Sequence, residues 1–303
     1  MGGSLLAMIL DAGGEGVLIA EGPRARRLTD DGLTVNGRHY GPDVDSEPES
    51  NDYSLILVAT KSTHLQDALP LICRAVLPVS DGDRPATVAS LLNGISSEEI
   101  LRSALGSGSE RFVVPAMILG IDAVRDGAEI TYLHRGTIHC GADAGTAPIE
   151  AARLDVIDEL LGSAGIPVSR STRIIQTLWW KFMINVGINQ ASAVLRAPYG
   201  LFQRSKPARE LMTSLMAEVL TLSRAAGTGL SDDHMQRWLE TLQGLNPEGK
   251  TSMLQDVEAG RPTEVDLFAE TVTQLGNDHS VPTPVNRTIL HTIRAIEEQQ
   301  FAT

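Results

Sequence analysis

Cysteine, aromatic residues and long apolar runs are all scarce in this 303-residue sequence. Its two cysteines, Cys73 and Cys140, lie far apart and have no metal-ligand spacing around them. This argues against a disulfide framework and favours reduced thiols. No apolar run approaches the ~18 to 20 residues of a membrane span, and the first residues lack the basic start of a signal peptide. We therefore expect a cytoplasmic protein.

Positive charge is scarce as well. Lys and Arg number 25 against 38 Asp and Glu, so the formal net charge is −13. Nucleic acids and anionic membranes are bound through basic surfaces that neutralise phosphates, and neither is an expected partner. His134, His139 and Cys140 lie near one another in sequence, but no further ligand falls at a useful spacing. No metal site is expected.

The length is about twice that of a usual domain, which predicts two domains. In the first half, "GVLIAE", "SLILVAT" and "ATVASLLNG" predict buried strands of a parallel sheet, and the helical "HLQDALPLICRAVL" completes a βαβ unit. From Ile149 onward strand signals fade and helices are expected. The predicted helices are Ala151 to Ala164, Thr172 to Leu195, Lys206 to Ala226, Asp232 to Leu245, Thr263 to Asn277 and Pro284 to Gln299. The sequence thus predicts an α/β domain at 1–168 and an all-helical domain at 169–303.

One of these helices carries an unusual set of polar residues in "LWWKFMINVGINQ". At about 100° per residue, Lys181, Asn185 and Asn189 fall within an arc of roughly 80°. Burying a lysine and two amides without partners is costly, and asparagine is a poor helix former for a solvent-facing edge. The pattern indicates either an internal hydrogen-bonded network or a cleft for a polar ligand, with a water-facing edge as the alternative.

The segment "LWWKFMINVGINQASAV" resembles the central helix of the ketopantoate reductase (2-dehydropantoate 2-reductase) family, where asparagines follow a lysine four and eight residues on. "GKTSMLQDVEAGRPTEVD" is similar to a second family motif, and "LLNGISSEE", "VRDG" and "GNDHSVPTPVN" fall in family order. The resemblance implies a Rossmann-type N-terminal domain that binds NADP(H), and a helical domain, with the site in the cleft between them. The implied reaction reduces ketopantoate to pantoate, a step toward pantothenate and coenzyme A.

The resemblance also implies roles for individual residues. Lys181 matches the catalytic lysine, and Glu264 matches the acidic residue of the site. The substrate-binding positions are matched by Asn185, Asn189 and Ser252, and the cofactor positions by Gly2, Lys61, Asn93 and, less closely, Ala123.

The chemistry suits these residue types. Hydride delivery to a ketone builds negative charge on oxygen, which the Lys181 ammonium can stabilise before donating a proton. The amides of Asn185 and Asn189 offer donors and acceptors to a hydroxy-keto acid, and the Ser252 hydroxyl suits its carboxylate. Glu264 can hold the substrate hydroxyl and favour the charged lysine.

Three of these residues would also suit their positions for purely structural reasons. Glu264 follows Thr263 at a predicted helix start, where the helix dipole favours an acidic residue in any case. Asn93 and Gly94 could form no more than a turn. Lys61 follows a strand at its carboxyl end, where ligands gather in open α/β sheets, but where a lysine can also be simply exposed.

The N-terminal part departs from the family in its glycine loop. A Rossmann domain opens on a strand and a Gly-x-Gly-x-x-Gly turn. Here Gly2 takes the place of the last glycine, and the first strand and the two earlier glycines have no counterpart. A start codon assigned too late would explain this. A chain that truly begins at Met1 is expected to fold weakly, to bind the cofactor weakly, or both.

Two further departures concern selectivity. Glu21 stands where an arginine commonly holds the NADP 2′-phosphate, and its carboxylate favours NAD(H). Arg24, Arg26 and Arg27 follow closely and favour NADP(H), so the choice of cofactor stays open. Tyr199 replaces a common asparagine and leaves the identity of the 2-keto acid open.

Two functional hypotheses follow. The first is an NAD(P)H-dependent oxidoreductase that acts on ketopantoate or another 2-keto acid. The second is a family member that has lost catalysis and binds a ligand, because the glycine loop is absent. The helical domain also offers apolar faces for self-association as a homodimer.

Overall fold

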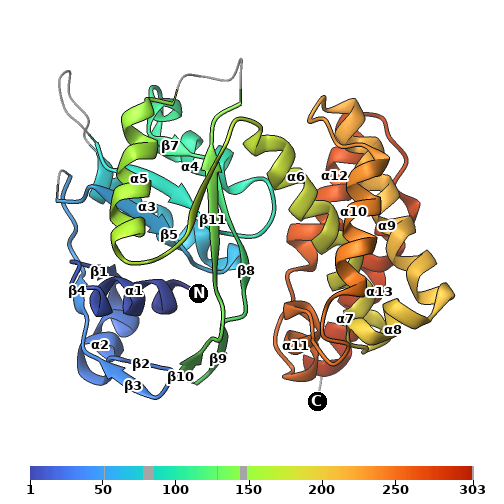
Figure 1. The fold of residues 1–303 in the computed structure, drawn as a ribbon, viewed down its shortest axis with the longest axis horizontal. Helices are drawn as coiled ribbons and strands as arrows, with labels where there is room; N and C mark the ends of the chain where they lie inside the picture. Colours follow the sequence, from blue (N-terminus) through green and yellow to red (C-terminus); the bar gives the residue numbers. More distant parts are fainter. Residues whose placement is uncertain (51, 78–84, 128, 144–148, 302–303) are drawn as a thin grey trace. The chain divides into compact units, whose positions relative to one another are not determined.

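The computed structural model describes residues 1–50, 52–77, 85–127, 129–143 and 149–301 (Figure 1). The chain forms two compact units. The first contains Met1–Leu92 and Ser96–Ile175, and the second contains Asn93–Ile95 and Gln176–Thr303. The short segment Asn93–Ile95 therefore belongs with the helical unit, although it closely follows a strand of the first.

The first unit is built on a parallel sheet in the order β5-β6-β7. These strands are β5 (Leu55–Val58), β6 (Thr87–Ser90) and β7 (Val113–Val114). Every residue of β6 is buried. Its consecutive residues Val88 and Ala89 point to opposite faces of the sheet and belong to different hydrophobic clusters. This is the alternation expected for a strand covered on both faces.

Helices cover both faces of this sheet. The cluster around Val88 contains side chains of α3 (Leu65–Val76) and α4 (Ser97–Leu105). The cluster around Ala89 contains side chains of α1 (Gly2–Asp11) and α5 (Ala151–Ser163). The predicted βαβ unit and α/β class are therefore confirmed.

The remaining described strands form three further sheets of two, four and three strands. Within the described residues, β1 (Val17–Ile19) pairs in parallel with β4 (Asp43–Asp45) and not with β5. The prediction that "GVLIAE" is a fully buried strand was wrong, because Val17 is 42% exposed. The other sheets have the orders β3-β2-β10-β9 and β12-β11-β8. Their strands are β2 (Leu33–Val35), β3 (Arg38–Tyr40), β8 (Ala116–Ile121), β9 (Val124–Asp126), β10 (Glu129–Thr131), β11 (Arg135–Gly141) and β12 (Val168–Ser171).

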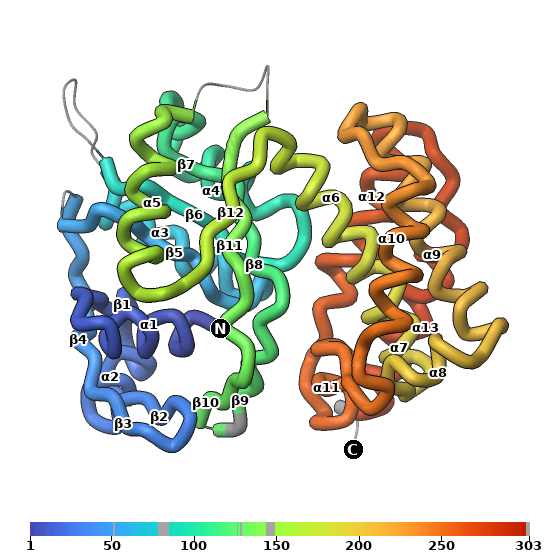
Figure 2. The backbone as a smooth tube through the Cα atoms, viewed as in Figure 1, coloured from blue at the N-terminus to red at the C-terminus, as the bar shows by residue number. Residues whose placement is uncertain are grey.

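The strand β12 lies in a segment where strand signals were expected to have ended. It pairs in parallel with β11, with Ile138 opposite Val168, and Figure 2 shows the two traces side by side. Its residues carry no apolar alternation, and apart from the packing of Val168 on a hydrophobic cluster this edge strand is attached through its backbone pairing with β11. The change to the second unit comes after it, between Ile175 and Gln176.

The second unit is helical, as predicted. Its elements are α6 (Ile174–Ile184), η3 (Asn185–Asn189), α7 (Gln190–Leu195), α8 (Tyr199–Arg204), α9 (Lys206–Ala225), α10 (Asp232–Gln243), α11 (Ser252–Glu258), η4 (Asp266–Glu270), α12 (Thr271–Asp278) and α13 (Pro284–Phe301). Both η3 and η4 are π-helices, in which hydrogen bonds run from residue i to i+5. The short helices α8 and α11 and both π-helices were not predicted. The first unit holds the further helix α2 (Gly22–Asp31) and the 3₁₀ turns η1 (Ser62–His64) and η2 (Ser109–Arg111).

The π-helix η3 packs closely on α9 at a glycine. A Cβ atom added to Gly187 would lie 2.4 Å from Met216 Cγ and 3.1 Å from the Met212 carbonyl oxygen. The first contact is shorter than real Cβ atoms show and the second is tighter than most, so Met216 or the backbone of α9 would have to shift to admit a side chain here.

Replacing Gly187 by Ala is expected to lower the free energy of unfolding by about 1–3 kcal/mol through overpacking. The matched control is Gly162→Ala in α5, where nothing lies within 4 Å of the added methyl. There the gain in helix propensity should raise stability by about 0.5–1 kcal/mol. Urea denaturation of both variants measures the difference, and equal effects would contradict the close packing at Gly187.

A buried carboxyl group lies at the start of α4. Glu98 is 7% exposed, and its Oε2 accepts a hydrogen bond of 3.1 Å from Ser97 Oγ, which in turn accepts one of 2.8 Å from Ser90 Oγ. Burial raises the pKa of Glu98, and hydrogen bonds from Ser97 and from backbone N–H groups, including that of Ala116, oppose the rise. Because the folded state holds this proton more tightly, the contribution of Glu98 to stability is full below its ordinary pKa of about 4.3 and is lost as pH rises through the raised pKa.

The Glu98→Gln variant is therefore expected to match the wild type near pH 4 and to be the more stable protein at neutral pH, because its side chain has no charge to bury. Free energies of unfolding measured from about pH 4 to pH 8 test this sign. Glu99→Gln, at the exposed neighbouring position, is the control. A Glu98→Gln variant that loses stability only at neutral pH would reverse the interpretation.

Candidate functional site

The polar residues Lys181, Asn185 and Asn189 extend from α6 into η3. Lys181 and Asn185 are half-buried, and Asn189 is 7% exposed. In an α-helix, four residues overshoot a full turn by about 40°. The wider π turn rotates less per residue, so the four-residue step from Asn185 to Asn189 turns through a smaller angle than it would in an α-helix. The predicted continuous helix is thus interrupted by a π turn at its two asparagines.

The amide nitrogen of Asn185 is buried, and within the described part of the chain it has no hydrogen-bond partner. A buried donor without a partner is uncommon in native structures because it keeps the full cost of desolvation. A ligand oxygen would remove that cost. The donor is therefore a specific feature that favours a polar ligand over a closed internal network.

Asn93 and Glu264 are separated by most of the sequence but are hydrogen-bonded. Asn93 Nδ2 donates to Glu264 Oε2 over 2.9 Å, and both residues belong to the second unit. The following residue, Gly94, has φ of 89°, and a Cβ there would lie 2.6 Å from Leu267 Cδ1. The segment after β6 is thus more than a turn, since it packs against the residues around Glu264.

Further contacts hold the backbone around Glu264. The N–H of Thr263 donates to Glu297 Oε1 over 2.7 Å, and Thr263 Oγ1 accepts from the N–H of Val265 over 3.3 Å. On the other side, Arg261 Nε donates to Asp256 Oδ1 over 2.8 Å. Glu297 was not identified from the sequence, because the contact depends on α13 lying beside this turn.

Ser252 is the first residue of α11, and it is exposed. The preceding Thr251 caps this helix by accepting from the N–H of Leu254 over 3.1 Å. The helix packs against η3 and α7, so Ser252 lies on an element that contacts the one bearing both asparagines. The structure therefore brings together the elements that carry Asn185, Asn189 and Ser252, and η4, which follows Glu264, also packs against η3.

Tyr199 supports the loop that leads to Ser252. The N–H of Tyr199 donates to the carbonyl of Gly249 over 3.0 Å, and that of Gly200 donates to Pro247 over 2.8 Å. A Cβ on Gly249 would lie 3.0 Å from the Tyr199 ring. Burial raises the pKa of the Tyr199 hydroxyl.

The other predicted cofactor positions lie in the first unit. A Cβ on Gly2 would lie 3.2 Å from the Cβ of Ala59, so the first residues of α1 pack closely on the chain just after β5. Close helix–strand packing is the role of the last glycine in a dinucleotide-binding turn. Lys61 follows at the start of η1 and is exposed. Ala123 lies apart from these residues in sequence, in the connection between β8 and β9, and is half-buried.

Positive charge is concentrated near the start of α2. Glu21 precedes this helix, and its carboxylate lies 3.4 Å from Arg74 Nη2, which also donates to the Ser46 carbonyl over 3.2 Å. Burial lowers the pKa of Arg24, and the charges of Arg125 and Arg27 lower it further. A group of guanidiniums close enough to repel one another, on an acidic protein, is suited to an anion.

Metal and membrane sites have no counterpart in the described residues. They contain no group of three or more His, Cys, Asp or Glu side chains placed to hold a metal ion. His134 instead contacts Asp122 over 2.9 Å. None of the described helices is both long and apolar enough to span a bilayer.

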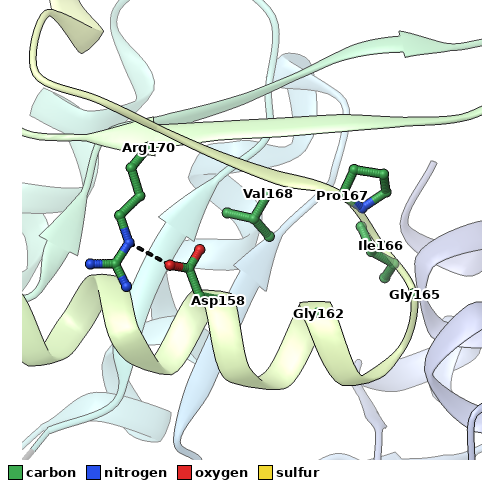
Figure 3. Close-up of a pocket in the computed structure, with 7 residues that line it drawn as sticks. All are labelled: Asp158, Gly162, Gly165, Ile166, Pro167, Val168 and Arg170. Carbon is green, nitrogen blue, oxygen red and sulfur yellow. Dashed lines mark hydrogen bonds and ion pairs between the residues drawn. The ribbon is translucent and has the colours of Figure 1, made fainter.

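A surface pocket in the first unit contains none of the predicted site residues (Figure 3). Arg170 on β12 and Asp158 on α5 form an ion pair at its edge. The rest of its lining consists of Gly162, Gly165, Ile166, Pro167 and Val168. It offers no nucleophile or proton donor beyond this ion pair.

Comparison with known proteins assigns both units to one family. The family model "Ketopantoate reductase PanE/ApbA" matches residues 1–145, and the family model "Ketopantoate reductase PanE/ApbA C terminal" matches residues 173–297. A 2-dehydropantoate 2-reductase from Archaeoglobus fulgidus is 26% identical over 97% of this chain and 94% of its own. One from Halobacterium salinarum is 26% identical over 96% of this chain and 94% of its own.

Solved structures share the fold. A PanE/ApbA family ketopantoate reductase from Ralstonia eutropha JMP134 superposes with a TM-score of 0.80 at 25% identity, covering 98% of this chain and 95% of its own. D-mandelate dehydrogenase, solved with NADH and anilino(oxo)acetate, superposes with a TM-score of 0.85 at 18% identity, covering 99% and 96%. The two family models together match most of the sequence, and the protein therefore belongs to the ketopantoate reductase PanE/ApbA family of oxidoreductases.

Proposed function

We propose that this protein reduces ketopantoate to pantoate with NADPH. The observation that carries the proposal is the 2.9 Å hydrogen bond between Asn93 and Glu264. Asn93 follows the carboxyl end of a parallel strand, where cofactors bind in open α/β sheets. Glu264 belongs to the motif that the family uses for substrate. Their hydrogen bond links a predicted cofactor position directly to a predicted substrate position.

The residues of the first unit fit a nicotinamide dinucleotide. The close approach of Gly2 to Ala59 is the packing that brings a helix N-terminus to such a cofactor, and Lys61 offers a charge at the end of β5. Arg24, Arg27 and Arg125 supply guanidiniums for a 2′-phosphate. Arg74 offsets the charge of Glu21. These features favour NADP(H) over NAD(H).

The proposed roles of the second unit follow from charge and donor geometry. When bound, the reduced nicotinamide supplies a hydride to the keto carbon. Lys181 stabilises the charge that builds on the keto oxygen and gives it a proton. Asn185 Nδ2, which has no partner among the described residues, donates to a substrate oxygen, and Asn189 and the exposed Ser252 hydroxyl complete the substrate contacts. Glu264, held by Asn93, accepts from the substrate hydroxyl.

Replacing Lys181 by Ala is expected to lower kcat for ketopantoate by about 10²–10⁴-fold, because general acid catalysis is lost. Steady-state kinetics with NADPH and with NADH provide the measurement. Lys206→Ala, which removes an exposed lysine paired with Glu210, is the control and should turn over normally. Unchanged turnover in the Lys181→Ala variant with both cofactors would rule out the proposed mechanism.

Replacing Arg24 by Ala is expected to raise KM for NADPH by about 10-fold or more while leaving KM for NADH nearly unchanged, since a charged hydrogen bond to phosphate contributes about 1.5–3 kcal/mol. Arg26→Ala on the same helix is the comparison variant, and a smaller rise in KM for NADPH is expected because the charge of Arg26 is not one of those that lower the pKa of Arg24. Equal effects on the two cofactors would assign Arg24 to a part of the cofactor that both share.

A reductase of another 2-keto acid is the second candidate. It is favoured by Tyr199, which stands at a position where the family commonly has an asparagine. The ring of Tyr199 packs on the loop before Ser252. Initial rates with ketopantoate, small aliphatic 2-keto acids and phenylglyoxylate separate the two candidates. Binding of NADPH without turnover of any acid would instead favour the hypothesis of a family member that binds ligands without catalysis.

A further inference from the structure

A chain of buried polar side chains connects the π-helix η3 to two neighbouring helices. Gln190 and Asn286 are each 0% exposed. Gln190 Nε2 donates to the Val186 carbonyl of η3 over 2.8 Å and to Asn286 Oδ1 over 3.2 Å. Asn286 Nδ2 donates to the Leu215 carbonyl over 3.2 Å and to Glu218 Oε2 over 2.7 Å. The chain thus extends from η3 through α13 to α9.

Glu218 closes the chain by capping α13. Its two carboxylate oxygens accept from the N–H groups of Val285 and Asn286 over 2.8 and 3.0 Å. These N–H groups lie in the first turn of α13, where no carbonyl of the same helix can accept from them. A carboxylate at this end is also favoured by the helix dipole. Glu218 therefore holds Asn286 in position to accept the hydrogen bond from Gln190, the first residue of α7.

Packing alone does not require these groups. An apolar side chain of similar volume would fill the position of Gln190 without burying an amide, and among the described residues Gln190 Oε1 is a buried acceptor without a partner. A network that is retained despite this desolvation cost is expected to fix the relative positions of the helices it joins, which apolar packing alone would not fix. The carbonyl that Gln190 contacts belongs to the residue between Asn185 and Gly187, at the beginning of the π turn.

We propose that Gln190 and Asn286 are positioning residues that hold the π turn of η3, and through it the side chains of Asn185 and Asn189. The effect on substrate binding rests on the proposed function. The effect on the backbone of η3 does not, so the two parts are measured separately.

The main variant is Gln190→Leu, which keeps a similar volume and removes the hydrogen bonds to Val186 and Asn286. Hydrogen exchange is followed in the peptides that contain η3, and kinetics are measured with ketopantoate and NADPH. We expect about five- to tenfold faster exchange in η3, in line with the loss of a buried hydrogen bond. We also expect about a tenfold rise in KM for ketopantoate, as for the loss of one well-placed hydrogen bond, with KM for NADPH unchanged.

Ser223→Ala is the control for a general loss of stability. Ser223 is also 0% exposed, and its hydroxyl accepts from the N–H of Leu230 over 3.0 Å and is bonded to Thr228 over 2.7 Å, away from η3. This variant should lose stability without faster exchange in η3 and without a change in KM. If Gln190→Leu behaves in the same way, the proposal is wrong.

A paired substitution keeps the test decisive if Gln190→Leu does not fold. Asn286→Asp retains the acceptor for Gln190 but places a second carboxylate beside Glu218, and should speed exchange in η3. Adding Glu218→Gln restores a donor to the contact with residue 286 and should recover part of the protection of η3 from hydrogen exchange. Recovery supports the positioning role, and its absence overturns it. Failure of the wild type to reduce ketopantoate would refute the proposed function alone, because the exchange results stand without it.

Discussion

The arrangement of the helical unit depends on the contact between η3 and α9 at Gly187. With no side chain at this position, Met216 and the Met212 carbonyl lie against the π-helix backbone. The side of η3 at Gly187 is therefore filled by α9, while α11 and η4 also pack on η3. Because one segment contacts so many others, its backbone geometry determines where the polar residues of at least three elements lie.

The placement of charge is a second constraint on this protein. A chain with a net charge of −13 must bind any anionic ligand through local positive groups. In the first unit we propose Arg24, Arg27 and Arg125 for this role, and their mutual repulsion contributes to the lowered pKa of Arg24. Arg74 at the same time offsets the charge of Glu21, the carboxylate that would otherwise repel a phosphate. In the sequence alone Glu21 argued against NADP(H), whereas the structure supplies a partner for it.

The parts of the fold that the sequence predicted share a strong local signal. The apolar runs of β5 and β6 and the helical periodicity of α3, α9 and α13 are clear in the sequence, and all five elements are present. The parts it missed have weak local signals. β12 is held by backbone pairing to β11, and the seven-residue α11 lies between two loops. The hairpin of β2 and β3 is the exception, because Asn36 and Gly37 in its turn, with φ of 48° and 76°, form a recognisable hairpin signal.

By itself, the sequence determined the family, the two-unit organisation and the residue types available for chemistry, because motifs and periodicity are local properties. Only the tertiary structure decided that the helix of Lys181 widens into a π turn at Asn185, that Asn93 contacts Glu264, and that Gln190 meets Asn286. The two side-chain contacts depend on groups brought together from distant parts of the chain. A π turn is rare and has no propensity signature of its own, and here one of its carbonyls accepts from a side chain that also contacts another helix.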